Sequence, residues 1–265
     1  MKQPLKKSIG SKDSGAILRT PKGNFFHGGD KNAIGIRPVP VEEIFEIEAK
    51  LVRIGAREAK ERERDYERYV SRLVDAVRKE QEDITVEAVR KQLGDDTITE
   101  VPMQLEAERL GNIIRIFRHE LDAHYRGGTK LIESVATEEF NCYSSSVIVA
   151  DALVRIGVPV GISTTLGHVA LRTERYMVET AAHLKDSIRD IRWIARYYDI
   201  IYDVGMEKLP GVAWYSHGIN LARYNTDEAI KAFDKALEIM PENVAVMFGR
   251  AYFMGYYSPI TRWDR

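Results

Sequence analysis

FNCYSSSVIVADALVRIGVPVGISTTLGHVALRTERYMVET, residues 140–180, is the stretch from which the fold of this chain follows. Residues 144–156 contain no Gly or Pro and are apolar on nearly every face, which predicts a buried helix. Asn141 can cap this helix from in front, and Gly157 shortly before a proline is a strong stop signal. A buried helix followed by short strands predicts an α+β fold in which the helix packs on an antiparallel sheet.

Cys142 is the candidate nucleophile of this stretch, and it is the only cysteine in the chain. The predicted helix places it in the first turn, where unpaired N–H groups and the helix dipole stabilise an anion. These conditions lower the pKa of a thiol and make it nucleophilic. A single cysteine is also compatible with a small buried hydrophobic residue, so this alternative stays open.

The segments after the helix carry two further candidates. Three short runs of β-branched and apolar residues follow, at residues 160–165, 167–172 and 176–180. If the last two form a hairpin with a two- or four-residue loop in which opposed residue numbers sum to 347, residue 172 opposes 175 and His168 lies directly opposite Glu179. Directly opposed Cβ atoms are roughly 4.5–5.5 Å apart, so the carboxylate could orient the imidazole. A loop with an odd number of residues would break this register.

The motif FNCYSSSVIVADALVRIGVPV…GHVALR…VET resembles the core of the transglutaminase-like (papain-like) superfamily. In that family a cysteine opens a helix that ends in a Gly-Ile/Leu-Pro turn, and a histidine begins a strand. The resemblance implies that Cys142 is the nucleophile, His168 the general base and acid, and Glu179 the orienting acid. It covers about forty residues, and Glu179-Thr180-Ala181 replaces the family's usual Asp-Pro-Thr.

An oxyanion hole is the least defined part of this candidate site. The sequence offers only the Asn141 side chain beside the backbone N–H of Cys142. The alternative for the whole triad is a set of structural residues in a non-catalytic relative that keeps the fold.

Composition describes a globular protein. Of 265 residues, 44% are hydrophobic and 30% charged, and the formal net charge is −1. This balance gives no bias toward nucleic acid or membranes, and no run is apolar and long enough to span a bilayer. One cysteine excludes an intrachain disulfide and a Cys-rich metal site, and it favours a reducing, cytoplasmic location. No cofactor is expected.

Four segments are expected along the chain. Residues 1–40 carry eight Lys or Arg against two Asp, a charge of about +6, which predicts a basic flexible tail. Residues 41–100 predict a helical arm, in which 41–82 form one long helix or two in series. Residues 101–210 hold the transglutaminase-like core, and 211–265 a C-terminal helical hairpin.

Residues 103–125 predict an amphipathic helix that contains the motif HELDAH. A zincin site needs histidines at positions i and i+4, whereas His119 and His124 are five apart and Ala123 stands at the required place. We therefore reject a zinc site. Residues 85–93 predict a short capped helix, 184–198 a helix and 200–204 a strand.

The C-terminal segment resembles a tetratricopeptide repeat in residues 213–243, AWYSHGINLARYNTDEAIKAFDKALEIMPEN. Residues 243–256 resemble the first helix of a second repeat. Because fewer than three repeats rarely stand alone, packing of this hairpin on the core is favoured over a peptide-binding groove.

Together with the resemblance, these observations predict a transglutaminase-like thiol hydrolase or acyl transferase, a cysteine peptidase or amidase that acts on an amide bond of a protein or peptide substrate. The alternative is a non-catalytic interaction or scaffold protein. A protein partner could be held by the basic tail, the helical arm or the tetratricopeptide-like helices.

Overall fold

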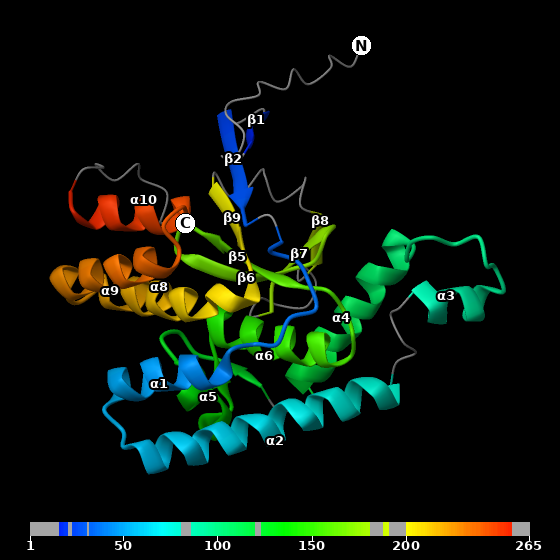
Figure 1. The fold of residues 1–265 in the computed structure, drawn as a ribbon, viewed down its shortest axis with the longest axis horizontal. Helices are drawn as coiled ribbons and strands as arrows, with labels where there is room; N and C mark the ends of the chain where they lie inside the picture. The colour runs from blue at the N-terminus through cyan, green and yellow to red at the C-terminus, as the bar shows by residue number, and fades with distance from the viewer. Residues whose placement is uncertain are drawn as a thin grey trace.

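The computed structural model describes residues 16–20, 23–30, 32–80, 86–119, 123–180, 188–190 and 200–255. These residues form one large mixed sheet with helices packed against it (Figure 1), and a separate pair of two-residue strands. The α+β fold class predicted from the sequence is therefore confirmed.

The sheet has seven strands in the order β1-β2-β9-β5-β6-β7-β8. The strands are β1 (Ala16–Thr20), β2 (Gly23–Gly29), β5 (Gly161–Thr165), β6 (His168–Arg172), β7 (Tyr176–Val178), β8 (Ile188–Asp190) and β9 (Ile200–Val204). All neighbours are antiparallel except β2 and β9, which run parallel. The predicted antiparallel sheet is thus a mixed sheet, because a strand from the N-terminal segment joins its edge.

The described part of the N-terminal segment is not a flexible tail. Strands β1 and β2 form a hairpin, and β2 extends the sheet beyond β9 through pairs such as Phe26 with Ile200. Gly29 lies so close to β9 that an added Cβ would meet the backbone oxygen of Asp203 at 2.5 Å. The glycine content that suggested disorder serves close packing here. Residues 1–15 lie outside the described part of the chain.

Helix α6 (Cys142–Arg155) lies between the sheet and the helical layer, as the sequence predicts (Figure 1). The Asn141 side chain caps it by accepting a hydrogen bond from the Ser144 N–H at 2.9 Å. Gly157 follows the helix in a left-handed conformation with φ of 84°. The helix packs on β5 and β6, and most of its side chains are buried.

The helical region before the core consists of α1 (Val41–Val52), α2 (Ala56–Glu80), α3 (Val86–Leu93), α4 (Met103–His119) and α5 (Leu131–Thr137). Residues 41–80 therefore form two helices in series, broken at Arg53, whose φ is 61°. Helix α2 packs along α5 and α6, and its apolar stripe, which includes Tyr66 and Leu73, is fully buried. Helices α1, α2, α4 and α5 contribute buried residues to the main hydrophobic core.

Two predicted helices differ from the structure. Helix α4 ends at His119, and His124–Tyr125 forms the short strand β3, which pairs in parallel with β4 (Glu139–Phe140). At residues 124 and 125 the pairing with β4 outweighs the helical periodicity of the sequence. Within residues 184–198, Ile188–Asp190 is the strand β8 rather than a helix, and the remainder lies outside the described residues.

The C-terminal helices are α8 (Leu209–Leu221), α9 (Thr226–Ile239) and α10 (Val244–Phe253), preceded by a short 3₁₀ turn, Met206–Lys208. A Cβ at Gly218 of α8 would meet the Phe233 ring of α9 at 2.7 Å, so the two helices approach closely. One hydrophobic core joins Val39, α2, α6 and these helices. The hairpin thus packs on the core, as favoured from the sequence.

No helix in the described ranges has the length and apolar character needed to cross a bilayer.

Candidate active site

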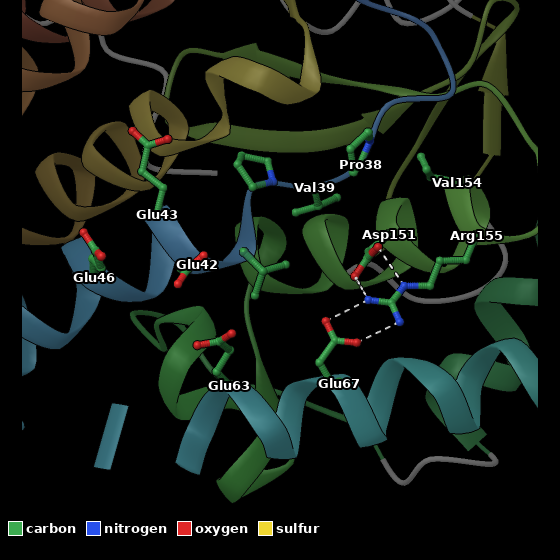
Figure 2. Close-up of a pocket in the computed structure, with 12 residues that line it drawn as sticks. Pro38, Val39, Glu42, Glu43, Glu46, Glu63, Glu67, Asp151, Val154 and Arg155 are labelled. Atoms are coloured by element: carbon green, nitrogen blue, oxygen red, sulfur yellow. Dashed lines mark hydrogen bonds and ion pairs between the residues drawn. The ribbon is translucent and has the colours of Figure 1, made fainter. Parts of the chain in front are cut away.

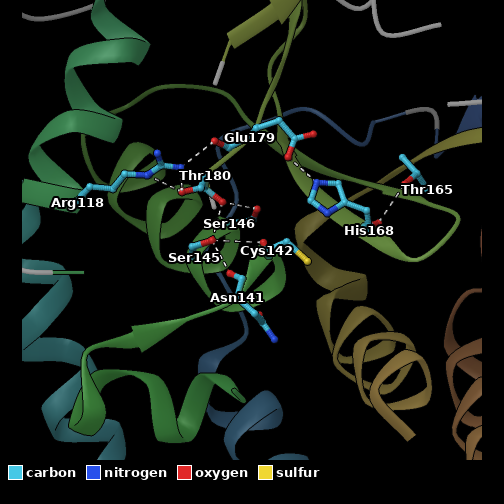
Figure 3. Close-up of polar contacts among 9 residues, drawn as sticks. All are labelled: Arg118, Asn141, Cys142, Ser145, Ser146, Thr165, His168, Glu179 and Thr180. Carbon is cyan, nitrogen blue, oxygen red and sulfur yellow. Dashed lines mark hydrogen bonds and ion pairs between the residues drawn. The ribbon is translucent and has the colours of Figure 1, made fainter. Parts of the chain in front are cut away.

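Cys142 is the first residue of α6 and is partly exposed. Its N–H belongs to the first turn of the helix, where backbone amides have no intrahelical acceptor. Its sulfur lies beside the His168 imidazole (Figure 3), and this imidazole and the Val169 N–H are the hydrogen-bonding groups that act on the thiol.

His168 is the first residue of β6 and directly follows a tight turn at Leu166-Gly167. Gly167 has a φ of 79°, a left-handed conformation that favours glycine. Its N–H donates to the Tyr215 hydroxyl of α8 at 2.8 Å, and that hydroxyl donates to the Thr165 carbonyl. Helix α8 therefore holds both sides of the turn that presents the histidine.

Glu179 follows β7 and binds the other side of the imidazole. The distance from His168 Nε2 to Glu179 Oε2 is 2.5 Å, and the side chains are 22% and 9% exposed (Figure 3). Because Nε2 is occupied by the carboxylate, Nδ1 is the nitrogen available to Cys142. The three residues selected from the sequence thus converge in the order cysteine, histidine, glutamate.

The strand register behind this contact differs from the predicted one. Arg172 pairs with Met177 and Leu171 with Val178, so His168 does not lie directly opposite Glu179. The difference from the predicted register is two residues, which keeps both side chains on the same face of the sheet. The glutamate therefore reaches the imidazole diagonally.

The charges of the triad are coupled. Burial by itself would raise the pKa of Cys142, but the hydrogen bond and charge of His168, with the Val169 N–H, lower the net pKa. Burial by itself would lower the pKa of His168, whereas its contacts with Cys142 and Glu179 raise the net pKa to about 10. Both shifts favour a thiolate–imidazolium pair that titrates as a unit.

A polar cluster that the sequence reasoning missed holds the segment after β7 against α6. The Thr180 hydroxyl lies 2.7 Å from Ser145 Oγ and 2.9 Å from Ser146 Oγ (Figure 3). Arg118 of α4 donates to the Thr180 carbonyl from Nη2 at 2.7 Å and from Nε at 3.1 Å. Three consecutive serines in an otherwise apolar helix were the available signal, because buried hydroxyl groups need partners.

The Asn141 side chain does not serve the predicted oxyanion role in this arrangement. Its amide donates to the Thr129 carbonyl at 2.8 Å, and its oxygen caps α6 through Ser144. Figure 3 shows the amide pointing away from the Cys142 sulfur. Of the two predicted oxyanion donors, the backbone N–H of Cys142 is the one that these contacts leave as a candidate.

A cavity in the described part of the chain lies away from the triad. It has a volume of about 690 Å³ and is lined by α1, α2 and the far end of α6 (Figure 2). Acidic side chains dominate it, and Arg155 binds Glu67 and Asp151 at its edge. None of its lining residues belongs to the triad.

Metal ligation finds no support in the described residues, which contain no group of three or more His, Cys, Asp or Glu suited to hold an ion. The two histidines of HELDAH lie on different elements, His119 at the end of α4 and His124 in β3.

Comparisons with family models, curated proteins and solved structures found no match for this chain.

Proposed function

We propose that this protein is a thiol hydrolase or acyl transferase with a transglutaminase-like core, acting on an amide bond of a protein or peptide substrate. The observation that carries the proposal is the contact chain from Cys142 through His168 to Glu179. It joins a nucleophile at a helix start, a base and an orienting acid, which is the arrangement needed for nucleophilic catalysis.

The proposed reaction uses the thiolate–imidazolium pair. The Cys142 sulfur attacks the carbonyl carbon, and the negative charge that develops on the oxygen faces the N–H groups at the start of α6. The C–N bond then breaks as the His168 imidazolium gives its proton to the leaving amine. His168 next takes a proton from water, the resulting hydroxide attacks the thioester, and the C–S bond breaks to release the acid.

Water is the proposed acceptor because no feature of the described residues marks an amine site. Glu179 stabilises the imidazolium and holds its orientation throughout. The non-catalytic scaffold remains the alternative, and the tetratricopeptide-like character of α8 to α10 remains a proposal. Their packing through Tyr215 on the turn before His168 supports a role in completing the site.

The test is the pH dependence of alkylation at the single thiol. At pH 6 we expect Cys142 to react with iodoacetamide about tenfold faster than free cysteine, because it is held as a thiolate. His168→Ala should abolish this advantage, and Glu179→Gln should reduce it. If the thiol of the folded protein reacts at the rate of free cysteine and neither substitution changes that rate, the catalytic proposal fails and the non-catalytic scaffold is favoured.

A further inference from the structure

The segment Glu179-Thr180 is fixed by contacts that reach well beyond its own strand. Arg118 comes from α4 and binds the Thr180 carbonyl twice, and its Nη2 also lies 3.4 Å from the Glu179 carbonyl. On the other side, the Thr180 hydroxyl sits between two serine hydroxyls of α6. The backbone that carries the acid is therefore held by both the nucleophile's helix and a second helix.

This attachment compensates for the register of the hairpin. Glu179 lies beyond the last paired residue of β7, Val178, and it reaches His168 diagonally. A glutamate has one more rotatable bond than an aspartate, so its carboxylate is less well located unless its backbone is fixed. Fixing residues 179 and 180 restricts where the carboxylate can lie relative to the imidazole.

Arg118 also acts through its charge. Burial lowers the pKa of Arg118 and the neighbouring Glu179 carboxylate raises it, so the two charges interact. A nearby cation favours the ionised form of the carboxylate, which is the form that stabilises an imidazolium.

We propose that Arg118 and Thr180 are positioning residues that hold Glu179 against His168 and thereby maintain the thiolate of Cys142. Both side chains act on the sulfur only through Glu179: Thr180 through the backbone position of the acid, and Arg118 through that backbone and through its charge. This inference rests on the proposed function, since it assigns a task to the same site.

The experiment uses the full chain and compares Thr180→Val with Thr180→Ser. Valine has nearly the shape of threonine but lacks the hydroxyl, whereas serine keeps it. Arg118→Lys keeps the charge but cannot place two donors on one carbonyl. Thr137→Val, at an exposed position at the end of α5, is the matched control.

For each variant, the rate of iodoacetamide alkylation is measured across pH, together with the melting temperature. The wild-type profile should show a thiolate–imidazolium window between two apparent pKa values. Thr180→Val and Arg118→Lys should each narrow the pH range between these two pKa values by about one pH unit, which corresponds to a tenfold change in a protonation equilibrium. Thr180→Ser and Thr137→Val should keep the wild-type profile.

The outcomes separate this inference from the proposed function. If Thr180→Val and Arg118→Lys lower the melting temperature but keep the wild-type profile, their role is structural and the inference is wrong. If His168→Ala also keeps the wild-type profile, the proposed function itself fails. If Thr180→Val does not fold, the alkylation profiles of Thr180→Ser and Arg118→Lys still test the inference. An unchanged pH profile in Arg118→Lys would overturn the role of the arginine.

Discussion

Replacing Glu48 with glutamine should remove a large part of the pH dependence of stability. Glu48 lies on α1, is 2% exposed, and accepts a hydrogen bond from the Ile132 N–H at 2.7 Å at the start of α5. Burial raises its pKa from 4.5 to about 7, opposed by the hydrogen bonds from Ile132 and Leu131. A glutamine can still accept the Ile132 hydrogen bond, but it carries no charge to bury.

The direction follows from the raised pKa. The native state binds this proton more tightly than the unfolded chain, so the protonated carboxyl's contribution is complete below about pH 4.5 and is lost as the pH rises to about 7. At about 1.4 kcal/mol per pKa unit, the full loss is roughly 3 kcal/mol. Between pH 5 and pH 8 the free energy of unfolding of Glu48→Gln should therefore rise by about 2 kcal/mol relative to the wild type.

The assay is urea denaturation followed by tryptophan fluorescence at pH 5, 6, 7 and 8 and constant ionic strength. Other titrating groups, including the triad, are common to both proteins and cancel in the difference. Glu43→Gln, an exposed position on the same helix, is the control and should show no pH-dependent difference. A difference between Glu48→Gln and wild type that stays constant over this range would refute the assignment of a buried carboxyl near neutrality.

Two further substitutions test the supports of the site. Tyr215→Phe should lower the free energy of unfolding by about 2 kcal/mol, because the Gly167 N–H loses its acceptor. It should also slow the alkylation of Cys142 at pH 6. A melting temperature and an alkylation rate equal to those of the wild type would contradict this. Asn141→Ala should lower the free energy of unfolding, measured by urea denaturation, by about 2 kcal/mol, because the α6 cap and the hydrogen bond to Thr129 are lost. Asn141→Asp keeps the capping oxygen and should lower it less. Equal losses in the two variants would show that the cap contributes little.

Helix α6 and its cysteine could be predicted because their determinants are local. Asn141 in front, an uninterrupted apolar run and Gly157 behind all lie within one stretch of seventeen residues, 141–157. Cap and stop signals act over a few residues, so a single sequence contains them in full. The position of His168 at the start of a strand is local in the same sense.

The hairpin register was missed because contacts within the turn decide it. The Thr173 N–H donates to the Tyr176 carbonyl at 2.8 Å, and the Thr173 hydroxyl accepts from the Tyr176 N–H at 3.1 Å. These bonds close the turn around Glu174-Arg175, one residue later than the turn at Thr173-Glu174 that the predicted register requires, so each pairing partner shifts by two residues. The buried Arg172 guanidinium, which donates to the Glu174 carbonyl at 3.0 Å, adds to this arrangement.

The N-terminal strands and the Arg118 contact could not be predicted because their partners are distant in sequence. Strand β2 pairs with β9, and Arg118 binds carbonyl groups some sixty residues further along the chain. Composition carries no information about such pairs, and a Lys- and Gly-rich segment has the same composition whether or not it finds an edge strand.

The contacts that the C-terminal helices make with the site could not be predicted from the sequence either, because their partners are also distant in the chain. A boundary near residue 211 follows from the change of sequence character, yet helix α8 begins at Leu209 and places Tyr215 on the turn before His168. Asn243, the cap of α10, donates to the Thr164 hydroxyl of β5 at 2.9 Å. Two polar side chains from the hairpin thus hold the strand and turn that lead into the histidine. Because these helices fix the turn that presents His168, changes in their packing should reach the proposed triad through that histidine.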